Sequence, residues 1–147
     1  GSNYEQHYSE ITGEDQVQIY EAILVDPQDQ VTTGLLTAIR YIKDNRILPK
    51  GFDKVTANED IAVKGAADSD NNFTGGSDRV RYRVKLQDVN GPFQINAELY
   101  YQPIAYRWAQ NLDSYEATET NKFVDYYNSM SEHSSVVLTS AKLSVTK

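Results

Sequence analysis

Residues 79–86 show the clearest alternation of apolar and polar side chains in the chain. The even positions carry valine, tyrosine or leucine and the odd positions carry arginine or lysine, which indicates a strand with one apolar and one cationic face. After the turn-forming residues 88–92, a second alternation runs over residues 93–101, and the two segments predict an antiparallel hairpin. The residues expected to be buried are Val80, Tyr82, Val84, Leu86, Ile95, Ala97 and Leu99. Those expected to be exposed are Arg79, Arg81 and Arg83.

Segments nearer the N-terminus also show recognisable spacing. Apolar side chains in residues 17–25 alternate with polar or mixed ones and stop at Asp26-Pro27, which predicts a strand that ends at a turn. Residues 31–45 fit both a helical stripe and an extended segment, and we expect a short helix or turn followed by a strand. Residues 52–77 are rich in Asp, Asn, Ala and Gly, so they are expected to form a long surface excursion.

The C-terminal third combines helical and strand-like patterns. Residues 104–112 follow Pro103 and predict a short helix. Thr120 is a candidate cap for a second helix, and residues 134–146 predict a returning strand. Because strands dominate the whole pattern, the expected fold is mainly β. It is an antiparallel β-sandwich, immunoglobulin-like or jelly-roll-like, with one or two short C-terminal helices.

Length and charge limit the classes of protein to which this chain can belong. The chain has 147 residues, a length at which one compact domain is the expected organisation. Gly1-Ser2 has the form of a tag remnant, so residues 3–147 are expected to be a single domain excised from a longer protein. No run of about 18 apolar residues occurs, so no membrane span is expected. The net charge of -7 repels phosphate, so nucleic acid is not an expected partner.

The absence of cysteine limits the chemistry of the chain. It excludes disulfides, thiol catalysis, cysteine-based zinc and iron–sulfur sites, and thioether attachment of haem. The sequence also lacks a nucleophile elbow, a phosphate-binding loop, a dinucleotide fingerprint and an HExxH helix. We therefore expect a protein that is not an enzyme and that holds no haem within this chain.

Residues 68–78 bring hard oxygen ligands into one polar loop. Asp68, Asp70 and Asp78 lie there together with two asparagines, and Ca²⁺ prefers about six to eight such oxygens. The spacing does not match an EF-hand, which needs a glycine and a glutamate at fixed positions. A mobile solvated loop is the first interpretation, and a calcium site at Asp68, Asp70 and Asp78 is the alternative.

The two histidines, His7 and His133, lie near opposite ends of the chain. Each is interpreted first as a surface or helix-end histidine. The alternative is an axial ligand of a metal or haem, which requires a neutral imidazole and a partner on another segment.

Aromatic residues provide a candidate binding surface. The chain has eleven tyrosines and one tryptophan, and Tyr100, Tyr106 and Trp108 could form a platform for sugar rings or a seat for a partner protein. Ile104, Trp108 and Leu112 recur at four-residue spacing, so we expect Trp108 to be buried and to anchor a helix. An exposed Trp108 would instead make the sugar platform, and with it a carbohydrate-binding module, the first interpretation.

Several strings of the sequence resemble the C-terminal region of bacterial multihaem c-type cytochromes. They follow one another in the same order, and the likeness covers roughly residues 4 to 143. The strings lie at residues 17–21, 31–36, 41–53, 78–82 and 99–104. The resemblance implies a haem-free, β-rich end of such a protein, with its CxxCH haem sites upstream of this chain.

Two functions from different classes follow from these observations. The first is a non-catalytic accessory domain of an exported, periplasmic bacterial cytochrome, which supports electron transfer by packing on the haem-bearing part or by seating a redox partner. The second is a carbohydrate-binding module of an exported protein. Calcium is the one cofactor that the residues themselves suggest.

Overall fold

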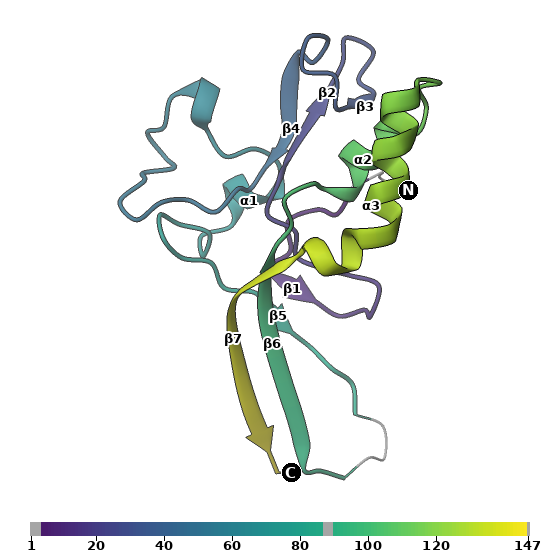
Figure 1. The fold of residues 1–147 in the computed structure, drawn as a ribbon. Helices are drawn as coiled ribbons and strands as arrows, with labels where there is room; N and C mark the ends of the chain where they lie inside the picture. The colour runs from purple at the N-terminus through teal and green to yellow at the C-terminus, as the bar shows by residue number, and fades with distance from the viewer. Residues whose placement is uncertain (1–3, 87–89, 147) are drawn as a thin grey trace. The chain divides into compact units, whose positions relative to one another are not determined.

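The computed structural model describes residues 4–86 and 90–146, and Figure 1 follows the chain through its helices and strands. Residue contacts divide the chain into two compact units, Gly1–Lys85 and Leu86–Lys147. Among the described residues, the first unit holds short strands and single-turn helices, whereas the second holds long strands and longer helices. The interpretation of residues 3–147 as a single domain stays a prediction.

A three-stranded antiparallel sheet forms part of the first unit. Strand β2 (Ala22–Val25) lies between β3 (Val31–Thr32) and β4 (Arg40–Asp44). Strand β2 is an unbroken apolar run, and its Ile23 and Val25 are almost fully buried. As the central strand, β2 pairs its backbone on both edges, and Ile23 and Val25 enter the core from one face.

The turn after β2 forms where the sequence predicts it. The Asp26 carboxylate accepts hydrogen bonds from the backbone N–H groups of Gln28 and Gln30, both at 2.9 Å. Asp29 adopts a left-handed conformation with φ of 59°, which aspartate tolerates better than most residues. The local chemistry of one aspartate therefore reverses the chain between β2 and β3.

A separate two-stranded sheet joins two distant segments of the first unit. Strand β1 (Glu10–Ile11) pairs in parallel with β5 (Arg81–Tyr82), with Glu10 opposite Arg81 and Ile11 opposite Tyr82. Arg83 extends the contact through its backbone N–H, which donates to the Ile11 carbonyl at 2.8 Å.

The core of the first unit is built largely by the segment expected to be a surface excursion. This segment contains the helical turns η1 (Glu59–Ile61) and α1 (Ala66–Ser69). The buried cluster is Leu48, Val63, Ala67 and Phe73, with Tyr20 and Phe52 packed against it. The expectation for residues 52–77 is wrong because single apolar residues at irregular spacing anchor this segment without producing a helical or strand-like period.

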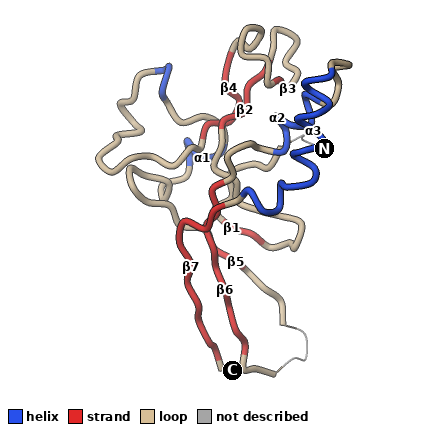
Figure 2. Tube along the Cα trace, in the orientation of Figure 1, coloured by secondary structure: helices blue, strands red, loops and turns tan. Residues whose placement is uncertain are grey.

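The second unit consists of a hairpin whose two strands are connected through helices. Strand β6 (Phe93–Tyr101) is followed by α2 (Tyr106–Leu112), α3 (Thr118–Ser134) and strand β7 (Val136–Val145). Strands β6 and β7 pair antiparallel along their whole length. Figure 2 shows both helices in the connection between the two strands.

Several predicted elements are confirmed, with differences at their ends. Residues 31–45 contain a turn followed by β4, residues 104–112 contain α2, and residues 134–146 contain β7. The predicted cap of α3 is wrong, because the N-cap residue is Ala117. The hydrogen bonds of the Thr120 hydroxyl run to the carbonyls of Tyr115 and Ala117, so it acts there as a donor.

The expected antiparallel β-sandwich is wrong. The described strands form three separate sheets of two, three and two strands, and the fold is a mixed α/β arrangement with no two sheets closed into a sandwich. Residues 93–101 pair with β7 in place of residues 79–86, because β7 offers a longer complementary alternation in which Leu143 faces Ile95 and Ala141 faces Ala97.

The burial expected for the first hairpin is also wrong. Val80 and Leu99 are half-buried, and the other five residues expected inside are exposed: Tyr82, Val84, Leu86, Ile95 and Ala97. The three arginines Arg79, Arg81 and Arg83 are exposed, as expected. Alternation identifies the two faces of a strand, but it does not supply the second layer that would cover the apolar one.

Candidate functional site

A cluster of buried polar side chains is the most distinctive site in the first unit. His7, Lys43 and Asn45 are each at least 95% buried, although such residues are rarely buried without partners. The His7 ring also packs against Phe73, with centroids 5.0 Å apart, and Phe73 stacks on Tyr20. The cluster is therefore anchored directly on the apolar core.

The protonation pattern of His7 is fixed by its neighbours. Its Nδ1 lies 2.9 Å from Gln18 Nε2 and 3.0 Å from Asn45 Nδ2. Both amides are oriented by backbone donors, because Gln18 Oε1 accepts from the Tyr8 N–H and Asn45 Oδ1 accepts from the Glu21 N–H. Two N–H groups therefore face Nδ1, which must act as the acceptor. The ring proton lies on Nε2.

Asp70 receives that proton's hydrogen bond. The distance from His7 Nε2 to Asp70 Oδ2 is 3.3 Å, and Asp70 Oδ1 accepts from the backbone N–H of Asn72 at 2.8 Å. Burial raises the pKa of Asp70, but the hydrogen bonds from Asn72 and His7 outweigh it, so the pKa lies below the usual range of an aspartate. Asp70 is thus held as a carboxylate.

Glycine at position 65 allows α1 to approach the sheet and so places Asp70. Gly65 has a φ of 76°, and a Cβ at this position would lie 2.9 Å from the Ile42 carbonyl oxygen. Any other residue would clash with the backbone of β4. Helix α1 begins at the next residue and ends immediately before Asp70.

Asp78 completes the polar cluster from the segment before β5. Its Oδ2 accepts a 2.7 Å hydrogen bond from the Tyr20 hydroxyl, and its Oδ1 accepts from the Arg79 N–H. Burial and this hydrogen bond raise the pKa of the Tyr20 phenol far above its usual value. The tyrosine therefore acts as a permanent donor to Asp78.

His7, Asp70 and Asp78 are close enough to be considered as ligands of one cation. Their ligand atoms all lie within 4.8 Å of one another. The tautomer of His7 argues against this use, because the nitrogen that faces Asp70 carries the proton and has no free lone pair. The carboxylates already accept hydrogen bonds from Asn72 and Tyr20. The geometry fits a structural network better than a metal centre.

The three residues of the calcium interpretation do not all come together. Asp70 and Asp78 come together, whereas Asp68 is exposed on α1 and lies outside the cluster that includes His7. Calcium binding at Asp68, Asp70 and Asp78 stays a prediction, and it would have to recruit Asp68 by a movement of the chain.

The histidines differ from each other. His133 lies exposed in the last turn of α3, as a helix-end histidine should. His7 is buried, so its interpretation as a surface histidine is wrong. Sequence reasoning missed it because its partners Gln18, Asn45 and Asp70 lie at unrelated spacings along the chain.

Lys43 joins three segments of the first unit. Its Nζ donates to the backbone carbonyls of Glu5 and Ile19 at 2.7 and 2.9 Å and to the Glu21 carboxylate at 3.2 Å. The side chain is 2% exposed, and a buried ammonium is tolerated only where oxygens replace its hydration. Lys43 thereby ties the N-terminal segment to β4.

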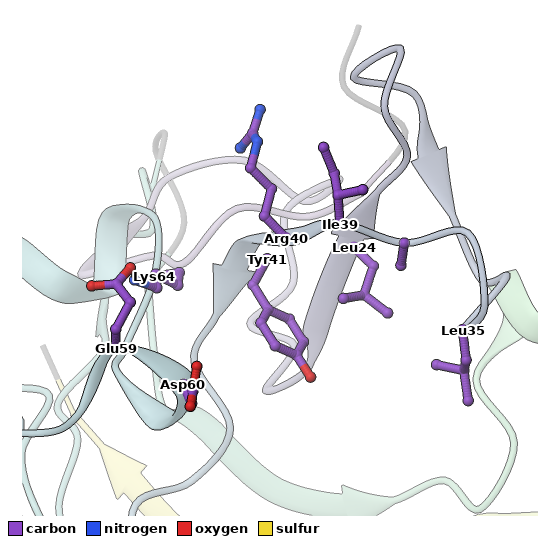
Figure 3. A pocket seen from close by; sticks show the side chains of 9 residues that line it. Leu24, Leu35, Ile39, Arg40, Tyr41, Glu59, Asp60 and Lys64 are labelled. Atoms are coloured by element: carbon purple, nitrogen blue, oxygen red, sulfur yellow. Dashed lines mark hydrogen bonds and ion pairs between the residues drawn. The ribbon is translucent and has the colours of Figure 1, made fainter.

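An open pocket of about 470 Å³ lies on the three-stranded sheet. Figure 3 shows Leu24 and Tyr41, from neighbouring strands, pointing to the same side. Leu35 lines one end, and an ion pair between Glu59 and Lys64 lies at the other. The described lining brings no paired nucleophile and base together, so the pocket does not resemble a catalytic site.

The aromatic residues proposed as a binding surface are exposed. Tyr100 is 51% exposed, Tyr106 67% and Trp108 42%. The expected burial of Trp108 is wrong: α2 begins only at Tyr106, so Ile104 lies before the helix, and the helix residue that is buried is Ala109. Tyr106 and Trp108 are two positions apart on one helix, so they point about 200° away from each other and do not form one flat platform.

Comparison with known protein families, curated proteins and solved structures finds no match to this chain. The resemblance to multihaem c-type cytochromes therefore stays a prediction. In the described part of the chain, no helix combines the length and apolar character needed to cross a bilayer.

Proposed function

We propose that the chain is a non-catalytic accessory domain of an exported, periplasmic multihaem c-type cytochrome and that it docks on the haem-bearing part of that protein. The observation that carries this proposal is the exposed apolar face of the β6–β7 hairpin. The resemblance of the sequence to the C-terminal region of such cytochromes supplies the identity of the partner.

The register of the hairpin separates its side chains into two faces. Residues directly opposite each other share a face, so Ile95 and Leu143 lie together, as do Gln94 and Ser144 on the other side. The apolar ribbon face consists of Phe93, Ile95, Ala97, Leu99, Thr139, Ala141, Leu143 and Val145, among which Thr139 is the one polar residue. The polar ribbon face consists of Gln94, Asn96, Glu98, Ser140, Lys142 and Ser144.

Within the described residues of the second unit, no second layer of buried side chains covers the apolar ribbon face. Ile95 is 50% exposed and Leu143 is 60% exposed, and every residue of β7 is exposed. Among the described residues of the second unit, only Ala109 and Val124 are buried. A two-stranded hairpin needs a further layer for stability in water, and large exposed apolar surfaces of soluble proteins usually mark interaction sites.

An accessory role fits the chemistry of the chain. It has no cysteine to attach haem, and neither the buried polar cluster nor the open pocket presents a reactive group. The domain would support electron transfer by holding the haem-bearing part or by seating a redox partner. The haems themselves would belong to the sequence that precedes this chain.

The first test reads the gene upstream of residue 3. CxxCH motifs are expected there, and an upstream sequence without them would contradict the cytochrome assignment. The second test cleaves the full gene product before residue 3 and measures, by haem absorbance on size-exclusion chromatography, whether the released domain remains with the haem-bearing fragment.

Ile95→Lys and Gln94→Lys form a matched pair for this second test, because they place the same charge on opposite faces of β6. Ile95→Lys should release the domain from the haem-bearing fragment, whereas Gln94→Lys should leave it bound. Equal retention of both variants would show that the apolar ribbon face is not the docking surface.

A carbohydrate-binding module is the second candidate. The exposure of Tyr100, Tyr106 and Trp108 favours it, because exposed aromatic rings can stack on sugars. It nevertheless ranks second, because the side chains of Tyr106 and Trp108 project from opposite sides of α2. Oligosaccharide titration distinguishes the two functions.

A further inference from the structure

Among the residues that the structure describes, β5 pairs with a strand on one edge alone. On one edge, the backbone N–H groups of Arg81 and Arg83 donate to the carbonyls of Ser9 and Ile11 at 3.0 and 2.8 Å. In an extended segment, successive residues direct their backbone groups to opposite edges. The groups of Tyr82 therefore face away from β1, as would those of Val84 in an extended continuation. Within residues 4–86 and 90–146 they receive no backbone hydrogen bond.

Strand β5 itself covers Arg81 and Tyr82, and the residues on either side continue its alternation, so an extended segment over residues 79–85 carries two rows of side chains of opposite character. One row is cationic and consists of Arg79, Arg81, Arg83 and Lys85. The other row is apolar and consists of Val80, Tyr82 and Val84, of which Tyr82 is 65% and Val84 is 74% exposed. An exposed amphipathic strand edge is normally blunted or covered in soluble proteins.

The cationic row is only partly neutralised. Glu10 of β1 contacts Arg83 at 2.9 Å and Arg81 at 3.9 Å. The arginine side chains nevertheless stay mostly exposed, and the neighbouring Asp78 is engaged by Tyr20. This segment therefore concentrates positive charge in a chain whose net charge is -7.

We propose that the open edge of Arg79–Lys85 binds an extended protein segment in which acidic residues alternate with apolar ones, added as a further β-strand. The spacing of alternate side chains in any strand is about 6.6 Å, so carboxylates at every second position match the cationic row. Apolar residues at the intervening positions cover Tyr82 and Val84. Backbone hydrogen bonds to the open edge supply affinity, and the two rows supply specificity.

This inference is independent of the proposed function, because the edge lies in the first unit and the apolar ribbon face lies in the second. The probe is a synthetic nine-residue peptide of alternating Glu and Val with blocked ends and a fluorescent label. Its anisotropy is measured against the purified chain at low and moderate salt. Binding is expected, and it should weaken as salt rises.

Peptide controls separate strand addition from simple charge attraction. A peptide with Lys in place of Glu should not bind. A peptide with the same composition but with N-methyl groups on the amides that face the edge should also fail. Equal binding of the N-methylated peptide, or of a polyanion without a peptide backbone, would overturn strand addition.

Variants of the protein test the two features of the edge separately. Replacing Arg81 and Arg83 together by glutamine should weaken binding about tenfold, because exposed ion pairs contribute modestly. Val84→Pro removes one open N–H and should abolish binding, whereas Val84→Thr keeps the N–H and should retain it. Unchanged binding by Val84→Pro would contradict the proposal.

A measurement on the unmodified protein tests the same site even if the proline variant does not fold. Amide hydrogen exchange at Tyr82 and Val84 should slow at least tenfold when the peptide is added. Exchange at Arg81 and Arg83, whose N–H groups are already bonded to the segment of β1, should change little. A peptide that binds without protecting Tyr82 and Val84 would place the site elsewhere.

Discussion

The Nε2–H of His7 donates to Asp70 Oδ2 at 3.3 Å, and this contact joins the N-terminal segment to the loop after α1. The partners of His7 come from three different parts of the first unit: Gln18, Asn45 and Asp70. The imidazole therefore organises the buried polar cluster and is not available for ligation at the nitrogen nearest the carboxylates.

Replacement of His7 should destabilise the first unit. His7→Ala leaves the amides of Gln18 and Asn45 without their acceptor and opens a cavity beside Phe73, so the free energy of unfolding should fall by about 3 kcal/mol. Urea denaturation followed by circular dichroism measures the change. His133→Ala is the matched control and should change stability by less than about 0.5 kcal/mol, because His133 is exposed. Equal effects of the two variants would contradict a structural role for His7.

Asp70 should make the stability of the first unit depend on acid pH. Its pKa in the folded protein lies below the usual value, despite burial, because Asn72 and His7 donate to it. A lowered pKa stabilises the fold above the unfolded-state pKa of about 3.9, and this stabilisation is lost as the pH falls through the folded-state value. Asp70→Asn should therefore flatten the acid limb of the stability curve. An unchanged acid limb would show that Asp70 does not contribute to it.

Lys43 should be sensitive to loss of its charge. Lys43→Met keeps most of the side-chain volume but leaves Glu21 and the carbonyls of Glu5 and Ile19 without their donor. The expected loss in unfolding free energy is about 3–5 kcal/mol, as for a broken buried ion pair. Lys64→Met removes the surface pair with Glu59 and should cost less than about 1 kcal/mol. A Lys43→Met variant as stable as the parent would show that the hydrogen bonds of Lys43 do not hold the N-terminal segment to β4.

The sequence predicts local structure in this chain better than it predicts tertiary contacts. The turn at Asp26 and the helix α2 follow from side-chain chemistry and short-range periodicity, which act over a few residues. Two segments compete to pair with residues 93–101, the neighbouring residues 79–86 and the more distant β7, and the alternation of each suits that pairing. Periodicity alone does not choose between them.

The candidate site was less predictable for the same reason. Asp70 and Asp78 stand out by composition, but His7 becomes recognisable only when the fold brings Gln18 and Asn45 to its Nδ1. Its burial depends on Phe73, an isolated aromatic residue in a polar stretch. Isolated apolar residues without a period carry little information about which segments they will contact.

The final prediction concerns Trp108, which is the only tryptophan and reports directly on α2. At 42% exposure its fluorescence should be quenched readily by acrylamide. Trp108→Ala should cost about 1–2 kcal/mol, less than the replacement of a buried tryptophan. Oligosaccharides should not change the emission of Trp108, because Tyr106 and Trp108 lie on opposite sides of the helix and do not stack together on one sugar ring.

The control for this titration is Tyr106→Ala, which removes the neighbouring ring and leaves Trp108 as the reporter. If sugars did quench Trp108 and the effect disappeared in Tyr106→Ala, the two rings would act together despite their positions on α2. Such a result, with the apolar ribbon face shown to be dispensable, would make the carbohydrate-binding module the better account. Emission that is insensitive to sugars in both proteins leaves the exposed aromatic side chains available for a protein partner.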